Sequence, residues 1–174
     1  MHYLNSVLLP PSDIAKRLVE YAQEHCATVA DNYCLSDQVL PHITLCQFQA
    51  DDISIFQDIE IKSPIDIELK KSNIREGDGI HNGYAWFELE VTKSEALVAL
   101  QGKVAQTINE RAGNISTRIG NGYHPHLTFC RTQFDKMNYL KSLKVPKKFL
   151  GLKKNYNFEI GYSDENGQYF GSLS

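Results

Sequence analysis

The hydrophobic and polar positions of the chain predict strands and helices in alternation. Residues 3–9 form a largely apolar run that ends at two prolines, which fits a strand because proline supplies no donor to a ladder of backbone hydrogen bonds. Apolar residues then recur at helical spacing, with Ser12 or Asp13 placed to cap the helix. The aliphatic and β-branched run at residues 40–48 suits a second strand. The predicted buried face of the helix comprises Ile14, Leu18, Ala22, Cys26 and Val29.

The same order of elements returns further along the chain. Residues 84–92 alternate as a strand does, and Thr92 with Glu95 forms the pattern of a capping box. Gly113 is placed to end the helix that follows, and residues 126–130 then read as a strand. We infer an internal duplication of strand, helix and strand. The predicted buried face of this second helix comprises Leu97, Leu100, Val104 and Ile108.

Three further segments have the composition of strands. They are residues 65–74, 149–162 and 167–173, and the last two are separated by the turn pattern SDENG at residues 163–167. A glycine-rich loop at residues 75–83 lacks the spacing of a phosphate-binding loop. The chain is therefore rich in strands, with two clear helices.

One motif occurs twice, as LPHITLCQF and as YHPHLTFCR. Both copies read Pro, His, aliphatic, Thr, apolar, Cys, and their histidines, His42 and His126, stand 84 residues apart. Six histidines and seven threonines would give about a quarter of one His-x-Thr triplet by chance, so two copies with matching flanks are a strong signal. In a strand alternate side chains share a face, so His42 lies beside Thr44 and His126 beside Thr128. Each strand thus offers an aliphatic face to a core and an imidazole with a hydroxyl to a cleft.

Two imidazoles and two hydroxyls across one cleft suit metal-free phosphodiester chemistry. A neutral histidine can take a proton from the attacking nucleophile while a protonated one gives a proton to the leaving oxygen. The hydroxyls of Thr44 and Thr128 can donate to the non-bridging oxygens of the phosphate. The sequence thus predicts His42 and His126 as the acid and base pair, without saying which is which. A strained 2',3'-cyclic phosphate is the substrate that fits best.

A structural Cys₂His₂ zinc centre is an alternative interpretation of the repeated motif, whose two copies supply the ligand types His42, Cys46, His126 and Cys130. On extended strands, positions four residues apart lie about 13 Å from each other, too far to share one tetrahedral ion. His124 with His126 forms a second possible pair, but no acidic residue lies beside it in the sequence. We therefore predict no metal ligands and no cofactor, and we expect the cysteines to act as small buried hydrophobic residues.

Composition limits the classes of function. At 174 residues, 42% of them hydrophobic, residues 1–174 fit one two-lobed domain without a separating linker. A net charge of −3 argues against a general nucleic-acid coat, which needs a broad basic surface. Four cysteines without a CxxC pair predict reduced thiols, and the amino terminus lacks a cationic leader. The expected protein is a cytoplasmic monomer with no membrane association.

With its paired His-x-Thr motifs, HIT at residues 42–44 and HLT at residues 126–128, the chain resembles the two-histidine (2H) phosphoesterase superfamily. The likeness is greatest to the bacterial RNA 2',3'-cyclic phosphodiesterases, also called 2'-5' RNA ligases, and it extends along the whole chain. It implies an α+β fold of two lobes, with antiparallel sheets related by a pseudo-two-fold axis, helices outside and a central cleft. It also implies that no metal is required.

The resemblance adds one residue to the predicted site. An arginine commonly follows the second histidine of that family by five positions, which here is Arg131. Period-two counting places Arg131 on the face opposite His126, so a bulge or the end of the strand must redirect it if it binds phosphate. After the first motif, CQFQADD departs from the aromatic-glycine ending usual in the family, which leaves the choice of substrate open.

The expected reaction is hydrolysis of a 2',3'-cyclic phosphate on a nucleotide or an RNA terminus. Two alternatives stay open: cleavage or ligation of 2'-5' phosphodiester linkages, and a catalytically silent module that binds RNA ends. The basic segment at residues 141–154 could follow a nucleic-acid backbone, although a solvated surface explains it equally well. Tyr123, Trp86 and Tyr169 are candidates for stacking on a base, although aromatic residues more often belong to a core.

Overall fold

The chain folds around one curved antiparallel sheet of nine strands. The computed structural model describes residues 1–59, 61, 64–77, 81–111, 113–151 and 153–173. The strands are β1 (His2–Leu9), β2 (Ala30–Cys34), β3 (Ile43–Ala50), β4 (Ile65–Glu76), β5 (Tyr84–Val91), β6 (Asn114–Ile115), β7 (His126–Gln133), β8 (Lys153–Ser163) and β9 (Tyr169–Ser172). The helices are α1 (Ser12–His25), α2 (Glu95–Glu110) and α3 (Met137–Ser142).

The order of the strands shows the internal duplication. Along the sheet it is β2-β7-β5-β4-β8-β1-β3-β6, with β9 beside β8. The first four strands can be matched one by one with the next four, so that β1 corresponds to β5, β2 to β6, β3 to β7 and β4 to β8. When each strand is replaced by its counterpart, the result is the same order read from the other end of the sheet. The boundary between β4 and β8 therefore divides this path into two sets of four strands that form equivalent lobes, which is the pseudo-two-fold α+β architecture expected from the sequence.

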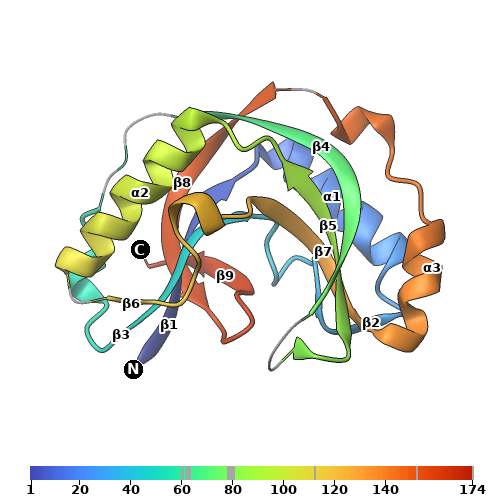
Figure 1. The fold of residues 1–174 in the computed structure, drawn as a ribbon, viewed down its shortest axis with the longest axis horizontal. Coiled ribbons are helices and arrows are strands. Elements are labelled where there is room, and N and C mark those ends of the chain that lie inside the picture. Colours follow the sequence, from blue (N-terminus) through green and yellow to red (C-terminus); the bar gives the residue numbers. More distant parts are fainter. Residues whose placement is uncertain (60, 62–63, 78–80, 112, 152, 174) are drawn as a thin grey trace.

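The helices lie on the outer side of the sheet and are exchanged between the lobes (Figure 1). Helix α1 packs on β7, whereas α2 packs on β3 and β6. Each helix thus covers the motif strand of the other half of the duplication. Consistent with this arrangement, the aliphatic faces of both motif strands are fully buried in one continuous core: Ile43, Leu45, Leu127 and Phe129 are all 0% exposed. Because this core fixes one face of β3 and of β7, their opposite, polar faces are turned toward the concave side of the sheet.

The amino-terminal ends of both long helices differ from the prediction. Helix α1 begins at Ser12 and Pro11 holds the capping position, where no side chain makes a capping hydrogen bond. Neither Ser12 nor Asp13 is therefore the cap, because proline already fixes the extended backbone that precedes the helix. The helix ends at His25, so the predicted continuation to Val29 was too long.

Helix α2 is capped by Ser94, whose hydroxyl accepts from the backbone N–H of Leu97 at 3.2 Å. The predicted capping box of Thr92 and Glu95 is not formed, because Ser94 is the cap and Glu95 is the first residue of the helix. The hydroxyl of Thr92 instead donates to Glu68 Oε2 at 3.1 Å, on the neighbouring strand β4. A tertiary partner thus replaced the local one that the pattern suggested.

The sequence also missed β2, β6 and α3, which are short or polar, and it began β8 four residues too early. The turn at residues 163–167 is present as predicted, and Gly167 has the positive φ of 80° that turn glycines supply. Part of the glycine-rich loop at residues 75–83 lies outside the described residues. No helix in the part of the chain that the structure describes is long and apolar enough to cross a membrane.

Candidate active site

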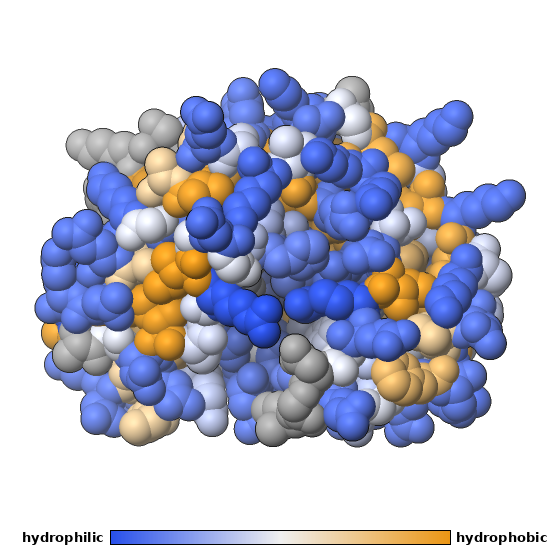
Figure 2. Space-filling model, in the orientation of Figure 1, coloured by the Kyte–Doolittle hydropathy of each residue, from blue (hydrophilic) through white to orange (hydrophobic). Residues whose placement is uncertain are grey.

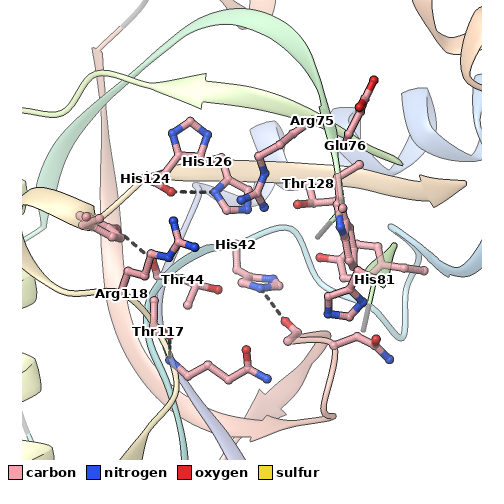
Figure 3. Close-up of a pocket in the computed structure, with 18 residues that line it drawn as sticks. His42, Thr44, Arg75, Glu76, His81, Thr117, Arg118, His124, His126 and Thr128 are labelled. Atoms are coloured by element: carbon pink, nitrogen blue, oxygen red, sulfur yellow. Dashed lines mark hydrogen bonds between the residues drawn. The ribbon is translucent and has the colours of Figure 1, made fainter. Parts of the chain in front are cut away.

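A cavity of about 530 Å³ opens between the two lobes, and both motifs line it. His42 and Thr44 reach it from the start of β3, and His126 and Thr128 reach it from β7 (Figure 3). The four residues predicted to act together therefore share one cavity. On the outside of the molecule, hydrophilic side chains surround a hollow in the middle of this face (Figure 2).

The two motif histidines are held in the same way. Nδ1 of His42 lies 2.7 Å from the carbonyl oxygen of Leu40, and Nδ1 of His126 lies 2.8 Å from that of His124. In both motifs a proline separates the two partners, and proline drives the residue before it into an extended conformation that suits this contact. Each Nδ1 therefore carries a proton for a carbonyl two residues earlier, which leaves each Nε2 for chemistry.

A β-bulge follows the threonine in each motif strand. Ser6 pairs with Cys46 and Val7 with Thr44, so Leu45 is the additional residue in β3. In β7 the additional residue is Phe129, between Thr128 and Cys130. The bulges leave two consecutive residues in the core and return the residue after them to the polar face. The residues redirected in this way are Gln47 and Arg131.

The hydroxyl of Thr44 is oriented by a buried amide. Asn5 Nδ2 donates to Thr44 Oγ1 at 3.1 Å and to the carbonyl oxygen of Gly167 at 3.3 Å. Because the threonine oxygen accepts from Asn5, its own proton stays available for an acceptor in the cleft. Thr128, 8% exposed, holds the equivalent place in the other lobe.

His42 is buried more deeply than its partner. Its Nε2 lies 3.1 Å from the carbonyl oxygen of Gly167, and its ring packs at 5.7 Å from that of Tyr169. Burial lowers the pKa of His42 to about 4, although the carbonyls of Leu40 and Gly167 favour the protonated form. A neutral imidazole has one N–H, so only one of the two carbonyl contacts is then a hydrogen bond. The shared geometry of the two motifs assigns that proton to Nδ1.

Glu88, a residue that the sequence did not single out, lies beside His126. Its side chain is 0% exposed, Oε1 lies 2.9 Å from Nε2 of His124, and Oε2 lies 3.8 Å from Nε2 of His126. Burial lowers the pKa of His126, while the Glu88 carboxylate acts in the opposite direction and Arg75 adds to the lowering. The sheet brings this carboxylate to the motif, since Glu88 of β5 pairs directly with Thr128 of β7.

The other lobe carries no carboxylate at the equivalent position. Val7 of β1 pairs with Thr44 just as Glu88 of β5 pairs with Thr128. The duplication therefore preserves both histidines and both threonines, but it places an ionisable side chain beside only one of the threonines. The two histidines consequently have different electrostatic surroundings, which a symmetric pair would not have.

Two arginines that the sequence analysis did not propose line the cleft. The side chain of Arg75 comes from the end of β4 and that of Arg118 from the segment after β6, and both point toward the cavity in Figure 3. Arg75 Nε also lies 3.4 Å from Glu88 Oε2. Guanidinium groups at these places can offset the negative charge of a bound phosphate. Their distance from the motifs in the sequence hid them.

Arg131 lies on the cleft side of β7, as its predicted role requires, because of the bulge at Phe129. Its Nε donates to the carbonyl oxygen of Asp31 at 3.1 Å, and Nη1 donates to Asn166 Oδ1 at 3.0 Å. The guanidinium also stacks 4.5 Å from the ring centre of Tyr84. Arg131 is not among the described residues that line the cavity, so its contact with phosphate stays a prediction.

The aromatic candidates separate into two groups. Trp86 lines the cleft together with Tyr33, and their rings meet edge to face at 5.4 Å. Tyr123 also lines it, but its hydroxyl donates to the carbonyl of Thr44 at 2.9 Å, and Tyr169 is 0% exposed. The six lysines of residues 141–154 are absent from the described lining of the cavity.

The Cys₂His₂ arrangement is not formed. Cys46 and Cys130 are free and fully buried in the core, on the faces opposite His42 and His126. The role expected of these cysteines, that of small buried hydrophobic residues, is confirmed. Among the described residues, the three that could hold a metal ion together are Glu88, His124 and His126.

Comparisons with known proteins identify the fold. No protein-family model and no curated protein matches the sequence. A crystal structure of a phosphoesterase matches with a TM-score of 0.60 and 16% identity, over 96% of this chain and 91% of that one. Usb1 of Kluyveromyces marxianus matches with a TM-score of 0.49 and 10% identity, over 92% and 93% of the chains. The same protein with uridine monophosphate gives 0.39 and 12%, over 82% and 75%. The phosphoesterase match confirms, at the level of the fold, the resemblance found in the sequence.

Proposed function

We propose that the protein is a 2H phosphoesterase that hydrolyses 2',3'-cyclic phosphates of nucleotides or RNA ends. The observation that carries the proposal is the matched construction of the cleft. Each lobe contributes one histidine with Nδ1 held by a carbonyl, and one threonine on the same face. The fold shared with a solved phosphoesterase supports the same class of reaction.

The proposed reaction uses the Nε2 atoms of the two histidines, since each Nδ1 is held by a carbonyl. One neutral imidazole takes a proton from water while the water oxygen forms a bond to phosphorus. The other imidazole, protonated, gives its proton to the ribose oxygen as the P–O bond breaks, leaving a phosphomonoester and a free hydroxyl. His42 suits the role of base, since burial keeps it neutral at physiological pH. His126 suits the role of acid because the Glu88 carboxylate, 3.8 Å from its Nε2, favours the protonated form against the effect of burial. Both proton transfers are supplied by the protein, so no metal takes part.

Hydroxyl and guanidinium groups would hold the phosphate between the histidines. Thr44 and Thr128 donate to its non-bridging oxygens, and these bonds strengthen as charge develops on them in the transition state. Arg75 and Arg118 offset the charge from the sides of the cleft. In this arrangement the phosphorus lies in line between the attacking water and the leaving oxygen.

The remainder of the cleft favours a nucleotide or a chain end over a long nucleic-acid strand. Trp86, with Tyr33 and His81 beside it, offers aromatic surface for a base at the edge of the cavity. The lysines of residues 141–154 do not line the described cavity, so they do not support binding of a backbone within it. A net charge of −3 likewise disfavours binding along an extended backbone.

A substrate panel tests the proposal. Protein freed of metal, with chelator present, is incubated with 2',3'-cyclic nucleotides, RNA ending in a cyclic phosphate, and 2'-5'-linked dinucleotides. We expect turnover of the cyclic phosphates, its loss in His42→Ala and His126→Ala, and its retention in His25→Ala, whose histidine does not line the cleft. Turnover of the 2'-5' linkages alone, or binding of RNA ends without turnover, would replace the proposal with one of the alternatives.

A further inference from the structure

We propose that Glu88, His124 and His126 form a binding site for a divalent transition-metal ion of the zinc class, and that a bound ion silences the cleft by occupying Nε2 of His126. Binding of the ion does not depend on the proposed reaction, whereas the silencing rests on it. The site would compete with catalysis, because a nitrogen that holds an ion cannot exchange a proton.

The three ligand atoms already lie close together. Those of Glu88, His124 and His126 are all within 4.8 Å of one another. Glu88 Oε2 and His126 Nε2 are 3.8 Å apart, too far for a hydrogen bond. Two ligands that each lie about 2.0 to 2.2 Å from a zinc ion are separated by a distance of this order. Two histidines with one glutamate is a set that zinc uses when it keeps a further position open.

The buried carboxylate of Glu88 and the lone pair of His126 Nε2 favour a bound cation at this place. The Glu88 side chain is 0% exposed, and its buried Oε2 atom accepts no hydrogen bond from the described residues. The proton of neutral His126 is committed to the carbonyl of His124, so the lone pair of Nε2 is directed to the same space. A buried carboxylate is costly unless a proton, an ion pair or a metal compensates it. The carbonyl contact at Nδ1 is also the usual support of a metal-binding histidine.

An ion can reach the site from the cleft, where it would compete with Arg75 for the Glu88 carboxylate. The side chains of His124 and His126 are 44% and 24% exposed, and both line the open cleft. Arg75 Nε lies 3.4 Å from Glu88 Oε2 and supplies part of the positive charge in the absence of an ion. Because the Arg75 side chain is 46% exposed, it can turn toward solvent when an ion takes its place.

The sequence pattern contained two of the three ligands of this site. His124 and His126 are two positions apart, and on an extended backbone they share a face, where their rings stack at 5.2 Å. With no acidic residue beside it in the sequence, the pair alone predicts no metal site. Strand β5 supplies that residue from 36 positions away, so the reason for dismissing the pair was wrong.

Zinc titration of the metal-free protein tests the site, with calorimetry as the measurement. The wild type should bind one ion per chain at this site. Glu88→Gln and His124→Asn should each weaken binding by more than about 100-fold, since the loss of a ligand exceeds the effect of its outer support. Arg75→Gln should bind more tightly, a gain that general damage to the fold would not produce. His25→Asn, which removes a histidine 3.7 Å from Glu24 outside the cleft, should bind as the wild type does.

Cobalt absorption and turnover complete the test. Cobalt(II) in the wild type should give visible bands without a thiolate charge-transfer band, which separates this site from the four cysteines. Zinc should inhibit hydrolysis at concentrations that follow its dissociation constant in each variant. Zinc binding that Glu88→Gln leaves unchanged, or a thiolate band, would overturn the site. Zinc binding lost in Glu88→Gln by a protein without turnover would support the site and reject the reaction.

Discussion

The side-chain amide of Asn5 holds the hydroxyl of Thr44 from inside the protein, with Nδ2 and Oγ1 3.1 Å apart. The same amide nitrogen contacts the carbonyl of Gly167, which in turn faces Nε2 of His42. Asn5 is 0% exposed and touches the cleft only through these partners. It therefore acts as a positioning residue for the threonine and the turn of the first motif.

Replacing Asn5 should reduce turnover without removing any group that contacts the substrate. In Asn5→Ala, Thr44 loses its donor and can rotate its proton away, so we expect kcat to fall by about 10-fold with a smaller change in KM. The free energy of unfolding should drop by about 1 to 3 kcal/mol, because buried partners lose a donor. Steady-state kinetics and urea unfolding measure both. Asn155→Ala, an exposed change on β8, is the matched control, and an Asn5→Ala enzyme with wild-type kcat would contradict the role.

The two threonines should contribute by similar amounts. Thr44→Val and Thr128→Val keep the side-chain shape and remove one donor each, so each should lower kcat by about 100-fold, as the loss of a donor to a developing oxyanion does. Thr107→Val, which removes a hydroxyl that donates to the carbonyl of Lys103 in α2 and does not line the cleft, should leave kcat unchanged. Kinetics on a 2',3'-cyclic nucleotide decide the matter. Wild-type kcat in either cleft variant would exclude that hydroxyl from phosphate binding.

Arg131 gives a prediction in which stability and binding can be separated. Its two donors hold the carbonyl of Asp31 and the side chain of Asn166, beside the turn that contains Gly167. A lysine cannot reproduce this fork, so Arg131→Lys should lower the free energy of unfolding by about 1 to 3 kcal/mol. Thermal unfolding measured beside KM distinguishes the two roles. A raised KM with unchanged stability would instead assign Arg131 to phosphate, as the family resemblance implies.

The sequence was informative where a local repeat carries the structure. The paired motifs predicted the duplication, the strands and the four residues that share the cleft, because alternation in a strand fixes which side chains face together. In the two motif strands, simple alternation is interrupted at Leu45 and Phe129, where the bulges shift it. Of the two ways in which Arg131 could be redirected, a bulge or the end of the strand, the structure has the bulge, at Phe129.

The remainder of the site depends on contacts that no local pattern encodes. Glu88 reaches the second motif through the register of β5 against β7, and Arg75 and Arg118 reach the cleft from segments with no motif of their own. Ser94 caps α2 because the hydroxyl of Thr92 is used by a neighbouring strand. In each case the placement depends on a partner from a distant segment of the chain, which a local pattern does not contain.

The buried imidazole of His42 should make stability depend on pH. Its pKa lies at about 4 in the folded protein, against an ordinary value of 6.5, with burial as the first cause and the carbonyls of Leu40 and Gly167 opposing it. The charge of His126 also faces it and adds to the lowering, while the ring of Tyr169 packs beside it. Between these two pKa values the unfolded chain binds a proton that the folded protein does not, so the free energy of unfolding falls as pH falls through this interval.

The expected loss due to His42 is about 3 kcal/mol between neutral pH and pH 4, from 1.36 kcal/mol for each unit of pKa difference. Urea unfolding at several pH values measures it. His42→Gln should remove this part of the pH dependence, while His126, whose pKa burial also lowers, keeps its own contribution in the variant. His25→Gln should retain the full wild-type slope. If His42→Gln lost stability with falling pH as steeply as the wild type, His42 would have to be protonated in the folded protein, donating to both carbonyls, and could not be the resting base.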